Sequence, residues 1–123
     1  MSILLVDDNA VVRQELALQL QMLGCDVVEA ADGLRALMLA REQRFSALVL
    51  DQRMPLMDGL TLARNLRELP ACASLPLILL TTDKLADIQP LAQRAGVSTV
   101  LAKPVVALDL ARALGHGADH VAA

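Results

Sequence analysis

Five short, mostly apolar runs restrict this chain to a small number of folds. A strand that is apolar at consecutive positions must be buried on both faces, as strands are in a parallel sheet covered by helices. Between the runs, apolar residues recur every three or four positions, which is the spacing of the buried face of a helix. The expected strands are residues 2–6, 27–30, 45–50, 77–80 and 99–102.

Helices are expected in the intervals between these strands. Asn9 and Asp58 can cap the first and third helices, and Gly24 and Gly96 can supply left-handed stops after the first and fourth. Pro90 lies inside the fourth helical pattern, where it costs about 3 kcal/mol, so a kinked, shortened or shifted helix is expected there. The helical patterns are Val12, Leu16, Leu20 and Leu23; residues 34–43; Leu60, Ala63, Leu66 and Leu69; residues 84–95; and residues 106–114.

Strands alternating with helices over short connections predict an α/β domain with a parallel sheet. At 123 residues the chain suits a single domain. The expected fold is flavodoxin-like and doubly wound, with a five-stranded parallel sheet of order 2-1-3-4-5 flanked by five helices. We expect the domain to span residues 1–115, and residues 116–123 to form a frayed or disordered tail.

Composition excludes several classes of partner. The net charge is -3, the basic residues are scattered, and Phe45 is the one aromatic residue, so nucleic acid is not an expected partner. No apolar run approaches the length of a membrane span. Cys25 and Cys72 lack metal-type spacing and are read as reduced thiols of a cytoplasmic protein. His116 and His120 fall in the tail and are assigned no role.

Polar side chains stand where the apolar strands end. Asp7 and Asp8 follow the first strand, Asp51 the third, Thr81 the fourth and Lys103 the fifth. In a parallel sheet these ends share one rim, so the three carboxylates should crowd together and require a cation, for which Mg²⁺ suits oxygen ligands. The lysine can hold an anion there. Without a glycine-rich phosphate loop, the set indicates a phosphoryl site rather than a dinucleotide site.

The joint order and spacing of these residues resembles the receiver domains of two-component response regulators. The resemblance covers about residues 2–115. It rests on Asp7-Asp8, Asp51 with Met54-Pro55 and Asp58-Gly59, Thr81, and Lys103-Pro104.

The resemblance implies a role for each residue of the rim. Asp51 would take a phosphoryl group, in a Mg²⁺-dependent transfer, from a phosphohistidine of a sensor histidine kinase or histidine phosphotransfer protein. Asp8, Asp51 and the backbone carbonyl of Arg53 would ligate Mg²⁺, and Asp7 would act mainly through a bound water. Such a domain is a signalling phosphoacceptor that assists only its own phosphorylation and dephosphorylation, rather than an enzyme.

The family implies three further features. Thr81 and Lys103 would hold phosphoryl oxygens, and the bond between Lys103 and Pro104 would be cis, which X-Pro bonds permit at little cost. Phosphorylation would alter interactions with a downstream protein target or a fused output domain. Asp7-Asp8-Asn9 with residues 101–104 resembles the receivers of hybrid sensor kinases. The chain is either a stand-alone receiver or a piece of a longer protein.

Several positions depart from the family pattern. Val100 replaces the aromatic residue whose rotamer usually follows the threonine, and Thr82 replaces a small residue and could crowd the pocket. Pro90 disturbs the helix that receivers commonly use to report their state. Arg53 and Asp83 flank the pocket, where they can admit or exclude an attacking water.

Two alternatives remain open. The first is a receiver-like protein-interaction domain that is not phosphorylated, which Val100 and Thr82 favour and the complete acceptor set disfavours. The second is an enzyme of similar fold that uses an aspartyl-phosphate or binds a flavin. The chain offers no cap insertion, no phosphate loop rich in Ser and Thr, and no aromatic pair for a flavin.

Overall fold

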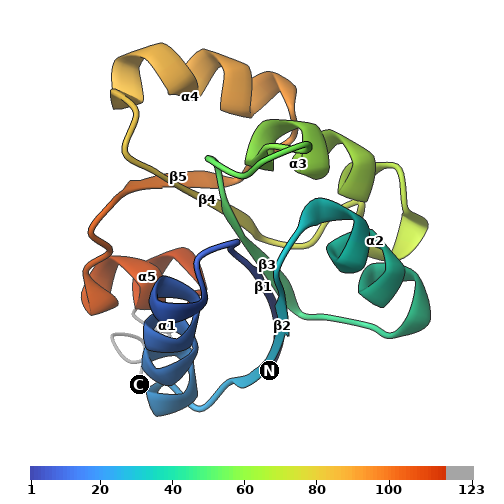
Figure 1. The fold of residues 1–123 in the computed structure, drawn as a ribbon, viewed down its shortest axis with the longest axis vertical. Coiled ribbons are helices and arrows are strands. Elements are labelled where there is room, and N and C mark those ends of the chain that lie inside the picture. Colours follow the sequence, from blue (N-terminus) through green and yellow to red (C-terminus); the bar gives the residue numbers. More distant parts are fainter. Residues whose placement is uncertain (116–123) are drawn as a thin grey trace.

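The computed structural model describes residues 1–115 and shows a five-stranded, fully parallel sheet (Figure 1). The strand order is β2-β1-β3-β4-β5, which confirms the predicted doubly wound arrangement. The tail predicted at residues 116–123, with His116 and His120, lies outside the described residues. The strands are β1 (Ser2–Val6), β2 (Asp26–Ala30), β3 (Ala47–Asp51), β4 (Leu77–Thr81) and β5 (Thr99–Ala102).

Helices cover both faces of this sheet. In Figure 1, α1 and α5 lie on one side and α2, α3 and α4 on the other. No helix within residues 1–115 is long and apolar enough to span a bilayer. The helices are α1 (Ala10–Met22), α2 (Gly33–Glu42), α3 (Gly59–Arg67), α4 (Leu85–Arg94) and α5 (Ala107–Ala113), with a short 3-10 turn η1 at Pro70–Cys72.

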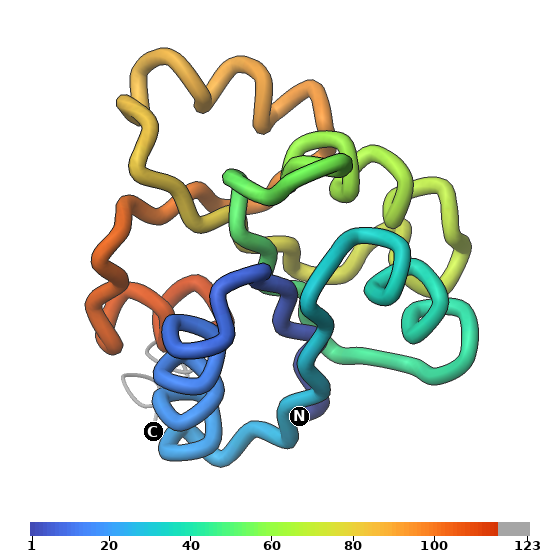
Figure 2. Tube along the Cα trace, viewed as in Figure 1, coloured from blue at the N-terminus to red at the C-terminus, as the bar shows by residue number. Residues whose placement is uncertain are grey.

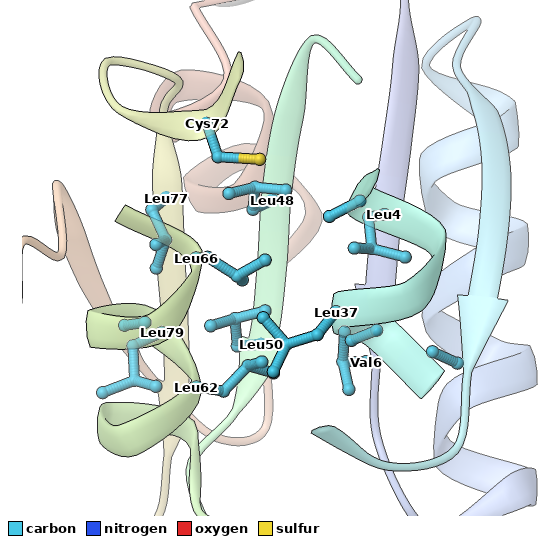
Figure 3. Packing of buried hydrophobic residues seen from close by; sticks show 14 of the residues in the cluster. Leu4, Val6, Leu37, Leu48, Leu50, Leu62, Leu66, Cys72, Leu77 and Leu79 are labelled. Atoms are coloured by element: carbon cyan, nitrogen blue, oxygen red, sulfur yellow. The ribbon is translucent and has the colours of Figure 1, made fainter. Parts of the chain in front are cut away.

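Successive side chains along a strand alternate between two hydrophobic cores, one on each face of the sheet. Leu4 and Val6 of β1 pack beneath α2 and α3, as Figure 3 shows, while Ile3 and Leu5 pack beneath α1 and α5. All residues of β3 and β4 are buried. Burying a side chain of this size contributes about 1.5 to 3 kcal/mol, so the central strands are held firmly from both faces.

The predicted helix ends are confirmed. The side chains of Asn9 and Asp58 accept hydrogen bonds from the backbone N–H groups of Val12 and Thr61. Gly24 and Gly96 have φ values of 86° and 87°, the left-handed conformation expected after a helix.

The bounds of several predicted elements differ from the structure by one or two residues. The third strand was expected at residues 45–50, but it spans Ala47–Asp51 and so includes Asp51 as its last residue. A kinked, shortened or shifted helix was expected at Pro90; α4 runs continuously from Leu85 to Arg94 with Pro90 inside it, one residue shorter at each end than the expected residues 84–95. The chain traced in Figure 2 turns from each strand into the next helix, so the loops that follow the strands share one edge of the sheet.

Candidate functional site

Asp51 lies at the carboxyl end of β3, a strand that is buried at every position. Its relative exposure is 5%, although it is the last residue of β3. The following loop returns close to it, and a Cβ built on Gly59 would lie 2.6 Å from the Asp51 carbonyl oxygen. A side chain at this position of α3 would therefore displace the backbone that carries Asp51.

Asp7, Asp8 and Asp51 form an acidic triad, with ligand atoms of all three carboxylates within 4.8 Å of one another. The Oδ1 atom of Asp7 accepts a hydrogen bond from the Asn9 N–H at 2.9 Å. Its Oδ2 atom is buried and accepts no hydrogen bond from residues 1–115. Crowded carboxylate oxygens with one buried atom unsatisfied fit a divalent cation with hard oxygen ligands, such as Mg²⁺.

Lys103 supplies a positive charge to the triad. Its Nζ atom donates a hydrogen bond to Asp51 Oδ1 at 2.8 Å and lies 3.5 Å from Asp7 Oδ2. The peptide bond between Lys103 and Pro104 is cis, as the resemblance implied. Burial lowers the pKa of Lys103, but its hydrogen bond to Asp51 and the charges of Asp51 and Asp7 outweigh burial, and the net pKa is raised.

The pKa of Asp51 is also raised. Desolvation is the largest cause, the hydrogen bond from Lys103 opposes it, and the neighbouring charges of Asp7 and Asp8 reinforce it. Three carboxylates sharing one ammonium thus leave an excess of negative charge that a cation would neutralise.

A cavity of about 250 Å³ opens over the triad. It brings together most of the residues predicted for the site, with Thr82 on its wall, where crowding was expected. Thr81 is not one of its lining residues, because its buried hydroxyl is turned toward Asp83. The lining residues are Asp7, Asp8, Asn9, Val12, Asp51, Arg53, Thr82 and Lys103.

Thr81, Asp83 and Arg53 form a second polar group beside the triad. The Thr81 hydroxyl donates to Asp83 Oδ2 at 2.9 Å, and the Asp83 N–H donates to Thr81 Oγ1 at 3.0 Å. The Arg53 guanidinium pairs with the other carboxylate oxygen, Asp83 Oδ1. The hydrogen bonds from Thr81 and Arg53 lower the pKa of Asp83, so it is an ionised carboxylate at neutral pH.

Two residues that position the site were missed by sequence reasoning. Gln52 is buried after Asp51, and its Oε1 atom accepts from the Leu60 N–H at 2.8 Å, which fixes the start of α3. Arg13 donates from Nη1 to the Asp7 carbonyl at 2.7 Å and pairs with Glu29 at 3.0 Å. A polar residue directly after a buried strand was a signal for Gln52, whereas Arg13 resembles any surface residue of α1.

The sequence matches a known protein family over nearly all of its described length. A family model described as "Response regulator receiver domain" matches residues 3–115. The chain is 40% identical over 105 residues to the sensor protein EvgS of Escherichia coli K12, covering 85% of this chain and 9% of EvgS. It is 42% identical over 103 residues to the response regulator receiver protein Anae109_2439 of Anaeromyxobacter, covering 83% of this chain and 42% of that protein. The chain therefore spans less than half the length of these relatives.

Solved structures show the same fold. The chemotaxis protein CheY4 of Vibrio cholerae superposes with a TM-score of 0.88 at 31% identity, covering 93% of this chain and 95% of that one. The receiver domain of the sensor histidine kinase PA1611 of Pseudomonas aeruginosa superposes with a TM-score of 0.83 at 35% identity, covering 92% and 93%. That structure is described with a magnesium ion coordinated in its active site cleft.

Proposed function

Because this chain belongs to the family of response regulator receiver domains, we propose that Asp51 accepts a phosphoryl group from a phosphohistidine of a partner protein. The observation that carries the proposal is the convergence of Asp7, Asp8 and Lys103 on Asp51. In the transfer, the N–P bond of the phosphohistidine breaks, an O–P bond forms at an Asp51 carboxylate oxygen, and the partner's imidazole keeps the electron pair of the broken bond. Such a reaction requires positioning and charge neutralisation more than covalent assistance.

Each residue of the site has a distinct part in this reaction. Lys103 already contacts Asp51 and is placed to hold one phosphoryl oxygen, and Thr81 would hold another. Mg²⁺, held by Asp8, Asp51 and the Arg53 carbonyl with Asp7 acting through a water, would neutralise charge on the phosphoryl oxygens. The unsatisfied Asp7 Oδ2 and the crowded triad support this ligand set.

The phosphodonor is a sensor histidine kinase or a histidine phosphotransfer protein. Relatives named as sensor proteins and histidine kinases carry similar sequences, which supports a donor of this class. Apolar side chains exposed on the segments that follow β1, β3 and β5 would meet such a partner, namely Val11, Leu56 and Val106. The phosphorylated state would then change contacts with a downstream protein or a fused output domain, so that the domain assists only its own modification.

We also place the domain in a reducing compartment such as the cytoplasm. Cys25 and Cys72 are both free and buried, and burial raises the pKa of both thiols. Raised pKa values keep thiols protonated and unreactive, which suits core packing rather than disulfide chemistry.

Intact mass spectrometry tests the proposed acceptor. Incubation with acetyl phosphate and Mg²⁺ should add one phosphoryl group to the native chain and none to Asp51→Asn. Asp32→Asn is the matched control, because Asp32 caps α2 and asparagine caps equally well. A native chain that gains no mass would instead support the protein-interaction domain, and a gain that persists in Asp51→Asn would place the acceptor elsewhere.

A further inference from the structure

The hydroxyl of Thr81 already donates a hydrogen bond to a neighbouring side chain in this structure. A threonine hydroxyl has one hydrogen to donate. In the unphosphorylated domain that hydrogen goes to Asp83 Oδ2 at 2.9 Å. The carboxylate of Asp83 has no hydrogen of its own, so the direction of this bond is fixed. Thr81 therefore cannot donate to a phosphoryl oxygen until it releases Asp83.

Asp83 is also held by a residue of another loop. Arg53, on the loop after β3, pairs with Asp83 Oδ1, while Thr81 occupies Oδ2. The Arg53 side chain is 71% exposed and that of Asp83 is 24% exposed, so water competes with the ion pair more than with the bond to buried Thr81. The three residues connect the loop after β3 to the end of β4 and the loop that follows it.

We propose that Asp83, braced by Arg53, is a positioning residue that holds the Thr81 hydroxyl away from the acceptor until phosphorylation draws it off. We call this trio, Arg53, Asp83 and Thr81, the latch. The inference rests on the proposed function, because the Thr81 hydroxyl must release Asp83 Oδ2 before it can donate to a phosphoryl oxygen on Asp51. It differs from a role in admitting water, since it concerns formation of the phosphorylated state rather than its decay.

Release of the latch would remove hydrogen bonds close to the start of α4. The Asp83 N–H also donates to Thr81 Oγ1, so movement of Thr81 breaks both bonds of the pair. Asp83 lies two residues before Leu85, the first residue of α4, and Lys84 between them makes no side-chain cap. The loop after β4 is thus loosened at the start of α4. In a domain with Val100 where an aromatic switch would stand, the latch provides a coupling that requires no aromatic ring.

A double-mutant cycle tests the latch through the initial rate of loading by acetyl phosphate and Mg²⁺, measured by intact mass. Asp83→Ala should load about tenfold faster than the native chain, a factor that corresponds to the lower end of the net strength of a hydrogen bond to a charged group. Loss of a negative charge also favours an anionic donor, but that contribution persists in a Thr81→Ala background. Asp83→Ala should therefore accelerate Thr81→Ala by a clearly smaller factor. Equal factors in both backgrounds would overturn the proposal.

Controls separate the latch from other causes. Asp87→Ala removes an exposed carboxylate from the first turn of α4, away from the hydrogen bonds of the latch, and should leave the rate unchanged. Decay after removal of acetyl phosphate is measured in parallel, and an effect of Asp83→Ala on decay alone would assign Asp83 to water access and overturn the latch. A native chain that never gains mass would instead refute the proposed acceptor.

A second measurement uses the native chain, so it tests the latch even if Thr81→Ala is not phosphorylated by acetyl phosphate. The Asp83 amide should exchange its hydrogen about fivefold faster by NMR in the phosphorylated state, because its acceptor Thr81 Oγ1 has moved. An exchange rate unchanged by phosphorylation would show that the Asp83 N–H remains hydrogen-bonded to Thr81 Oγ1, and would contradict the latch.

Discussion

The side chains around Asp51 are arranged to be incomplete without a cation. Lys103 donates to Asp51 at 2.8 Å, yet the pKa of Asp51 remains raised by desolvation and by the charges of Asp7 and Asp8. One ammonium among three carboxylates leaves net negative charge in a largely buried place. Binding of a divalent ion would relieve this repulsion, so the residues favour function at the expense of stability of the metal-free fold.

Stability in metal-free buffer should depend on pH through Asp51. Because its folded pKa is raised, its contribution to the free energy of unfolding is present below the unfolded pKa of about 3.9 and is lost as the pH rises through the folded value. The native chain should therefore lose stability relative to Asp51→Asn as the pH rises above about 4. Urea denaturation of both proteins with EDTA measures this difference. A difference that stays constant across the range would contradict the prediction.

Sequence reasoning located the ionisable residues better than their hydrogen bonds. Asp7, Asp8, Asp51 and Lys103 were predictable because each follows an apolar strand, and strand ends of a parallel sheet share an edge. The rotamer of Thr81 was not, because a hydroxyl at a strand end can face the site or a neighbouring loop with similar energy. Which one it faces depends on Asp83, a contact absent from any periodic pattern.

At the level of elements, close packing at the start of α3 fixes the position of the Asp51 backbone. A Cβ at Gly59 would lie 2.6 Å from the Asp51 carbonyl oxygen and 2.6 Å from Leu79 Cδ1. Gln52 reinforces this junction through its bond from the Leu60 N–H. The start of α3 is therefore packed directly against the end of β3.

Gly59→Ala should destabilise the fold by about 1 to 3 kcal/mol, the usual cost of overpacking a well-packed site. It should also slow loading of Asp51, because the backbone that carries the carboxylate must shift. Urea denaturation and the acetyl phosphate assay measure the two effects. Arg64→Ala, at an exposed position of α3, is the control and should change neither. Native-like stability of Gly59→Ala would refute the close packing.

Pro90 lowers the stability of α4 without breaking it. It has no N–H for the carbonyl four residues earlier, Ala86, yet Ile88 and Ala92 remain buried against the core. The helix persists because burial of this apolar face outweighs the local penalty, a tertiary contribution that local sequence rules do not include. This is why α4 continues through Pro90.

Pro90→Ala should raise the free energy of unfolding by about 2 kcal/mol. This figure is the roughly 3 kcal/mol cost of an interior proline, less about 1 kcal/mol that proline gains by restricting the unfolded chain. Urea denaturation measures it, with the exposed neighbour Gln89→Ala as the control. A loss of stability in Pro90→Ala would show that the proline is favourable in this helix.

For the molecule as a whole, the parallel order of the sheet makes the site. Each of the strands β1, β3 and β5 contributes a charged residue at or just after its carboxyl end, although these residues are far apart in the chain. This arrangement was predictable because buried apolar strands separated by helices admit few topologies. The positions of strand ends were less certain, as the inclusion of Asp51 in β3 shows.

Mg²⁺ should stabilise the whole domain by mass action. At a concentration one hundred times its Kd, a ligand that binds only the folded state contributes about 2.7 kcal/mol. Thermal unfolding of the native chain should shift upward with Mg²⁺ and return to its original midpoint with EDTA. Asp8→Asn should show a much smaller shift, because it removes a ligand of the triad. Equal shifts in both proteins would contradict the proposed ligand set.

The measurement that tests the central claim most directly is chemical trapping of the modified residue. Borohydride reduces an acyl phosphate to an alcohol, so phosphorylated aspartate becomes homoserine, which peptide mapping by mass spectrometry can locate. After treatment with acetyl phosphate and Mg²⁺, homoserine should appear at position 51 and at no other aspartate. Homoserine at Asp7 or Asp8, or at none of the three, would contradict the account.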